Sequence, residues 1–139
     1  MRSSAASDVY KRQELLLRNV VRVDDGSLAC SGDVWEGASV RLMMGTREGA
    51  IEAAKVSAEQ AREGMTRVAF GLVFDSVARR RLCGRQAVEE VRAVQAGLGP
   101  QVPFVGCYTY GEHAPLRALT SRGRSYFHNA AALVITVGS

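Results

Sequence analysis

The chain lacks a long hydrophobic segment. Its longest uncharged apolar stretch runs from Ala130 to Val137, whereas a membrane-spanning helix needs about 20 apolar residues. No apolar segment of the kind found in signal peptides follows the N-terminus. With 139 residues, the chain has the length of a single domain with its own hydrophobic core. We therefore expect a soluble, cytoplasmic protein without a membrane partner.

Cysteine and histidine are also scarce. The three cysteines, Cys30, Cys83 and Cys107, include no C-x-x-C pair, which argues against a disulfide framework or a zinc knuckle. The two histidines, His113 and His128, have no second ligand at a metal-binding spacing. A metal site would have to gather Cys83, Cys107, Glu112 and a histidine from separate strands. The sequence predicts reduced thiols, no metal and no cofactor.

The basic excess is small. The formal net charge is +4, but part of it lies in the first thirteen residues, MRSSAASDVYKRQ, which resemble the translated end of a sequencing-library transposon. Without residues 1–13 the chain has 15 basic and 13 acidic residues. We interpret 1–13 as a non-native or disordered leader and 14–139 as the domain. No basic stripe with interleaved aromatic residues is present, so we expect no nucleic-acid partner.

Hydrophobic periodicity divides the chain into strands and helices. After Thr46, which can cap a helix, apolar residues from Ile51 to Met65 recur at steps of three and four. A second helix is expected to begin within residues 78–86 and to run to Leu98. The run Asp24-Asp25-Gly26 is typical of a hairpin turn. Strands are expected over residues 15–23, 27–30, 39–45, 66–76, 103–110 and 125–138.

This order predicts an α+β fold with two layers. Two helices cannot cover both faces of a wide sheet, so we expect both on one face of a mixed, mostly antiparallel sheet of about six strands. The other sheet face would be open, or would pack against another domain.

The polar residues at the predicted strand ends allow three interpretations. An enzyme would pair Cys107 or Ser76 with a histidine oriented by Asp75 or Glu112, but no catalytic signature spacing is present. An interaction module would use the open sheet face. A ligand-binding site needs an arginine for a carboxylate, an acid for an amine, and phenols, amides and a glycine for orientation and close approach. Such groups are Arg79, Glu112, Tyr108, Tyr110, Asn129 and Gly111.

Three segments together resemble a known family. They are LVFDSVARRRLCG at 72–84, VPFVGCYTYGEHAP at 102–115 and FHN at 127–129. They are similar to the C-terminal domain of the FIST family of bacterial signal-transduction proteins. Ser76 stands where the family pattern has a cysteine.

The resemblance implies a non-catalytic sensory domain that binds a small molecule, with amino acids as the suggested ligand class. It further implies two partners, a companion N-terminal FIST domain and a signalling output domain. The ligand-binding residues that it suggests are Ser76, Arg79, Tyr108, Tyr110, Gly111, Glu112, Phe127, His128 and Asn129.

Overall fold

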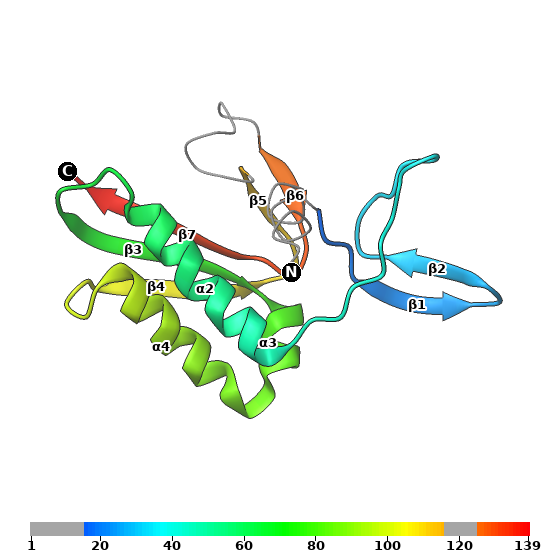
Figure 1. Ribbon diagram of the computed structural model, residues 1–139, viewed down its shortest axis with the longest axis horizontal. Coiled ribbons are helices and arrows are strands. Elements are labelled where there is room, and N and C mark those ends of the chain that lie inside the picture. The colour runs from blue at the N-terminus through cyan, green and yellow to red at the C-terminus, as the bar shows by residue number, and fades with distance from the viewer. Residues whose placement is uncertain (1–15, 116–124) are drawn as a thin grey trace, which may run out of the picture.

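A computed structural model describes residues 16–115 and 125–139 (Figure 1). The predicted leader, 1–13, lies outside these ranges. The centre of the fold is a three-stranded sheet in the order β4-β3-β7, formed by β4 (Phe104–Thr109), β3 (Val68–Ser76) and β7 (Ala132–Gly138). The central strand β3 pairs parallel with β4 and antiparallel with β7.

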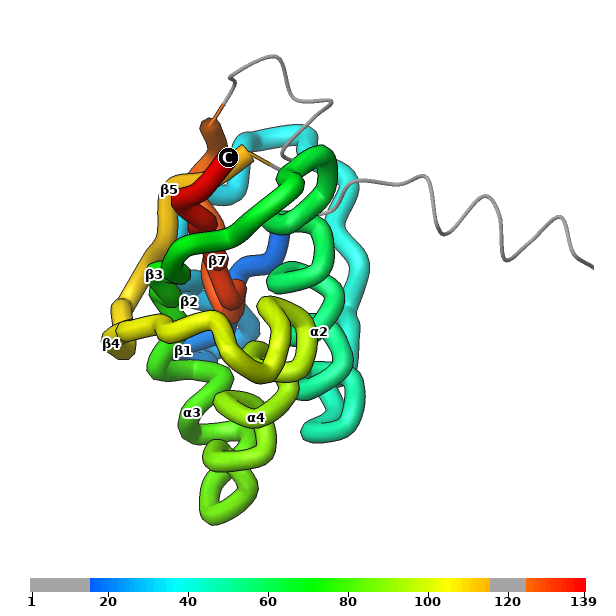
Figure 2. The backbone as a smooth tube through the Cα atoms, turned by 90° about the vertical axis from the view of Figure 1, so that its left-hand side faces the viewer, coloured from blue at the N-terminus to red at the C-terminus, as the bar shows by residue number. Residues whose placement is uncertain are grey.

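Two helices cover one face of this sheet, α2 (Arg47–Arg62) and α4 (Ala87–Leu98) (Figure 2). The Thr46 hydroxyl caps α2 by accepting from the Gly49 N–H at 3.0 Å, as expected for a helix start. None of the helices in the described ranges is both long and apolar enough to cross a membrane. The helices and the sheet enclose one buried cluster, made of Ala54, Ala58, Val73, Val94, Leu98 and Val134.

The second predicted helix is interrupted. Helix α3 (Val77–Cys83) follows β3 directly, and a short 3-10 helix, η1 (Gly84–Gln86), leads into α4. Gly84 has φ +55°, a backbone conformation that glycine adopts without a steric penalty. This break turns the chain so that α3 lies at the end of the sheet while α4 returns along its face.

The remaining strands form two small antiparallel sheets. One is the hairpin of β1 (Val20–Asp24) and β2 (Ser27–Cys30), closed by Asp25 and Gly26 at positive φ, as the sequence predicts. The other pairs β5 (Glu112–Ala114) with β6 (Tyr126–His128).

The α+β class and the placement of both long helices on one face are confirmed. The strands, however, are divided among three sheets. Residues 39–45 are not assigned to a strand, and Leu42 and Met44 are more than 90% exposed, at 91% and 93%. A strand requires a hydrogen-bonded neighbour, which alternation of apolar residues alone does not provide. The predicted strand 125–138 is broken at Ala130, whose φ of +53° turns the chain between β6 and β7.

Within residues 16–115 and 125–139, no helix covers the second face of the central sheet, in keeping with the two-layer prediction. Side chains alternate along a strand, so Phe70, Val105, Cys107 and Ile135 project to the side opposite Val73. All four are exposed, Val105 by 66%.

Candidate functional site: a buried ion network beside a polar strand-end cluster

Several segments meet where β3 and β4 end. Ser76 lies opposite Thr109 in the parallel pairing, and the Ser76 N–H donates to the Ala131 carbonyl at 3.0 Å. The carboxyl ends of β3 and β4 therefore lie beside the turn that precedes β7. The Ser76 side chain is buried and accepts from the Ala78 N–H at 3.4 Å, which caps α3.

Arg79 is the centre of a buried ion network. From α3, its Nε donates to Asp75 Oδ1 at 3.1 Å, and its Nη2 forms an ion pair with Glu90 of α4. Nη2 also donates to the Ala50 carbonyl of α2 at 2.6 Å, and Nη1 to the Ala130 carbonyl at 3.5 Å. One guanidinium thus ties β3, α2, α4 and the turn before β7 together.

The network is buried and carries two carboxylates for one guanidinium, and both features raise pKa values around it. Burial, followed by the negative charge of Glu90, raises the pKa of Asp75 to about 7, although Arg79 opposes the shift. Burial and then Glu90 also raise the pKa of the Cys83 thiol, which donates to Glu90 Oε2 at 3.7 Å. Burial and then Asp75 raise the pKa of Tyr108.

A second polar group, the strand-end cluster, consists of half-buried Thr109 and of two buried side chains, Glu112 and Asn129, the latter next to His128, the strand partner of Glu112. The Thr109 hydroxyl donates to Glu112 Oε1 at 2.6 Å and lies 3.2 Å from the Asp75 backbone oxygen. Glu112 is 3% exposed and Asn129 1% exposed. Asn129 Oδ1 accepts from the Ser31 hydroxyl at 2.8 Å. Within the described part of the chain, Glu112 Oε2 and Asn129 Nδ2 have no hydrogen-bond partner.

The β5–β6 pair holds this cluster in place. Glu112 lies opposite His128, and a ring nitrogen of His128, Nε2, is 3.0 Å from the Ala114 carbonyl. A Cβ at Gly111 would collide with the Phe127 ring, so glycine is required there for close packing. The Phe127 ring also contacts the His113 ring, with centroids 5.2 Å apart.

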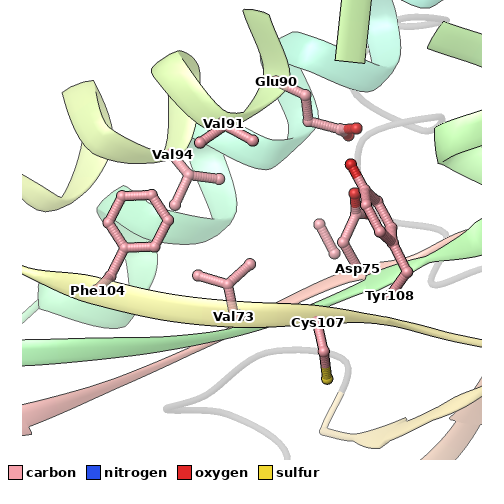
Figure 3. Close-up of a pocket in the computed structure, with 10 residues that line it drawn as sticks. Val73, Asp75, Glu90, Val91, Val94, Phe104, Cys107 and Tyr108 are labelled. Carbon is pink, nitrogen blue, oxygen red and sulfur yellow. The ribbon is translucent and has the colours of Figure 1, made fainter. Parts of the chain in front are cut away.

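The two tyrosines of the predicted site lie apart from the strand-end cluster. Tyr108 is partly exposed and lines a cavity of about 190 Å³ between α4 and the sheet (Figure 3). Its ring lies under the Arg80 guanidinium, 6.0 Å from the ring centroid. Tyr110 is 83% exposed.

The predicted residues therefore fall into three groups. Ser76, Glu112 and Asn129 are buried near the strand ends; His128 lies opposite Glu112 in the β5–β6 pair, and Gly111 packs against Phe127. Arg79 reaches that region only through the Ala130 carbonyl, because its other donors serve the ion network. Tyr108 faces the cavity, and Tyr110 faces solvent.

Sequence reasoning missed Glu90 and Thr109. A signal for Glu90 was available, because it falls on the same helical face as Ala87, Val94 and Leu98, all buried. A carboxylate on an apolar face needs a buried partner. Thr109, between Tyr108 and Tyr110, gave no such signal.

Neither histidine is hydrogen-bonded to Cys107 or Ser76 in the described ranges. Cys107 is exposed and points away from the cavity (Figure 3). The described residues also include no group of three histidine, cysteine or acidic side chains able to hold a metal ion.

These features define an α+β domain with buried, incompletely paired polar groups at its strand ends and a separate cavity between α4 and the central sheet. The family model of the FIST C domain matches residues 3–115, so the chain belongs to this family. The matched range includes Arg79, Tyr108 and Glu112 and ends before Phe127. Comparisons with curated proteins and with solved structures give no match. Family membership fits a sensory domain of a signal-transduction protein.

Proposed function

We propose that this domain is an intracellular, non-catalytic sensor that binds an amino-acid-like metabolite at the strand-end cluster. The proposal rests on one observation: Glu112 Oε2 and Asn129 Nδ2 are buried without a partner in the described ranges. A buried polar atom without a hydrogen bond costs about 1–3 kcal/mol, so a ligand that supplies the missing partners gains that energy on binding.

The chemistry of the two atoms suggests the ligand class. The carboxylate oxygen of Glu112 can accept from a ligand ammonium group, and the Asn129 amide can donate to a ligand carboxylate. Because the Ser31 hydroxyl already donates to Asn129 Oδ1, the amide nitrogen is the part of Asn129 left for a ligand. An α-amino acid carries both complementary groups.

The other predicted residues belong to the proposal in supporting positions. Arg79 would hold the backbone directly after Asn129, because it donates to the Ala130 carbonyl. Gly111, Phe127 and His128 would hold Glu112 in place through the β5–β6 pair. Ser76 would fix the end of β3, whereas Tyr108 and Tyr110, which lie apart from the cluster, would not contact the ligand.

Signalling requires a ligand that favours one of two arrangements of the protein. We propose that ligand binding at the β5–β6 pair is transmitted to a companion N-terminal FIST domain and to an output domain.

A thermal-denaturation screen of amino acids tests the proposal. A ligand specific for the folded state should raise the free energy of unfolding by about 2.7 kcal/mol at about 100 times its Kd. The N-acetylated and the amidated forms of the same amino acid should both lose this effect, because each removes one charged group. Glu112→Gln should abolish the response, whereas Glu36→Gln, an exposed glutamate in the 31–46 segment, should preserve it.

An equal response of Glu112→Gln and the native chain would place the ligand elsewhere. If no amino acid stabilises the native chain, the proposed function is wrong, and the open apolar sheet face makes an interaction module the better description.

A further inference from the structure

A cavity of about 190 Å³, open to solvent on one side, lies between α4 and the central sheet (Figure 3). Glu112 and Asn129 are not among the residues that line it. Its walls are hydrocarbon from four elements: Val73 of β3, Val91 and Val94 of α4, Phe104 of β4 and Ala132 of β7. An apolar cavity of about 150 Å³ is large enough to bind benzene in another protein. This cavity can therefore hold an aromatic ring or a short alkyl chain.

One end of the cavity is polar and acidic. Asp75, Glu90 and Tyr108 line it there, and Figure 3 shows their side-chain oxygens pointing toward one another. Both carboxylates share the single guanidinium of Arg79, so these three side chains carry one net negative charge when both carboxylates are ionised. The Arg80 guanidinium lies outside this group, 6.0 Å from the Tyr108 ring centroid. A buried charge that is not fully paired is unfavourable, and a second cation would compensate it.

We propose that this cavity is a second binding site, for a small primary amine with an apolar body such as an arylmethylamine. The ammonium group lies at the acidic end beside Asp75, and the hydrocarbon lies between Val73, Val91 and Phe104. This site differs from the strand-end cluster in its residues and in its ligand, which needs no carboxylate.

The cavity selects against other ligand classes of the same size. An aromatic carboxylate would bring a second negative charge beside Asp75 and Glu90. A neutral alcohol would gain the same hydrocarbon contacts as the amine but would leave the net charge uncompensated. The charge of the ligand head group therefore decides the affinity.

Calorimetric titration with benzylamine, benzyl alcohol and benzoate tests this inference. At about pH 8, above the pKa of Asp75, the native chain should bind benzylamine roughly tenfold or more tightly than benzyl alcohol, and benzoate least. Asp75→Asn, which keeps an acceptor for Arg79 and removes the net charge, should make the amine and the alcohol bind equally. Glu89→Gln, an exposed neighbour of Glu90 on α4, should keep the preference.

Filling the cavity provides an independent variant. Val91 is partly exposed, so Val91→Trp can place its ring in the cavity with little strain in the core. It should remove binding of both benzylamine and benzyl alcohol while the circular dichroism spectrum stays native. The inference is overturned if the native chain binds no benzylamine, if the alcohol binds as tightly as the amine, or if folded Val91→Trp binds both normally. Should Val91→Trp not fold, the Asp75→Asn titration decides the question.

Discussion

Glu90 and Glu112 are two buried glutamates with nearly equal exposure, 2% and 3%, but with different partners. Glu90 pairs with the Arg79 guanidinium and accepts from the Cys83 thiol, so both of its oxygens are engaged. Glu112 accepts a single hydroxyl, from Thr109, and its second oxygen has no partner in the described ranges. Burial and residue type are the same for both. The two glutamates therefore differ in pairing: Glu90 holds elements together, whereas Glu112 keeps an unpaired oxygen within the described part of the chain, and the proposed ligand site rests on that oxygen.

The largest expected effect comes from removing Arg79, the cation that pairs with Glu90. Arg79→Met would leave Asp75 and Glu90 as two buried carboxylates without a cation. We expect the free energy of unfolding to fall by about 3–5 kcal/mol, measured by urea denaturation. Arg81→Met, an exposed position two residues further along α3, is the matched control and should change it by less than about 0.5 kcal/mol. Equal losses in both variants would show that the network contributes nothing specific.

The next effect is the pH dependence that Asp75 confers. Its pKa is raised from 3.8 to about 7 in the folded protein, so between these values the folded state holds a proton that the unfolded state has released. The stability contributed by Asp75 is therefore fully present below pH 3.8, is lost progressively as pH rises toward about 7, and changes no further above that.

Asp75→Asn should flatten this dependence. Urea denaturation of both proteins at several pH values between about 4 and 8 measures the difference between the two curves. The native chain should lose stability relative to Asp75→Asn as the pH rises. A native curve parallel to that of the variant, or one that rises relative to it, would contradict the assignment.

The smallest effect compares the two glutamates directly, with the same substitution at each. Glu90→Gln should lower the free energy of unfolding by about 1–3 kcal/mol, because Arg79 loses a charged partner. Glu112→Gln should leave it unchanged or raise it by about 1 kcal/mol or less, because it removes a buried charge that has no cation. Both values come from urea denaturation without added ligand. A loss at Glu112 as large as that at Glu90 would make Glu112 a structural residue.

Much of the local structure follows from short-range patterns. The cap at Thr46, the alanine spacing of α2 and the Asp25-Gly26 turn depend on residues within a few positions of one another, and each was predicted. The exceptions are residues 39–45, residues 125–138 and the second predicted helix, which is interrupted at Gly84. In the first, an alternating pattern has no neighbouring strand to pair with. In the second, Ala130 at positive φ divides an apolar segment whose pattern predicts a single strand.

The sequence predicted which residues would belong to the candidate site, but not which side chains would pair with one another. Glu112 and Asn129 were named from the sequence, and both are buried with one unpaired atom in the described ranges. Arg79 was assigned to a ligand carboxylate in the same way. Its guanidinium instead contacts Asp75 and Glu90. No pattern in the sequence predicted the cavity that these two carboxylates line.

The sequence by itself determined the two long helices, most of the strands and which polar side chains stand at the strand ends, because caps, turns and periodicity act over a few residues. Only the tertiary structure decided that Arg79 contacts Glu90, that Thr109 reaches Glu112 and that α4 leaves a cavity above β3. These outcomes depend on distances between elements that are far apart in the chain. A side chain pairs with whatever group the packing brings within hydrogen-bond reach.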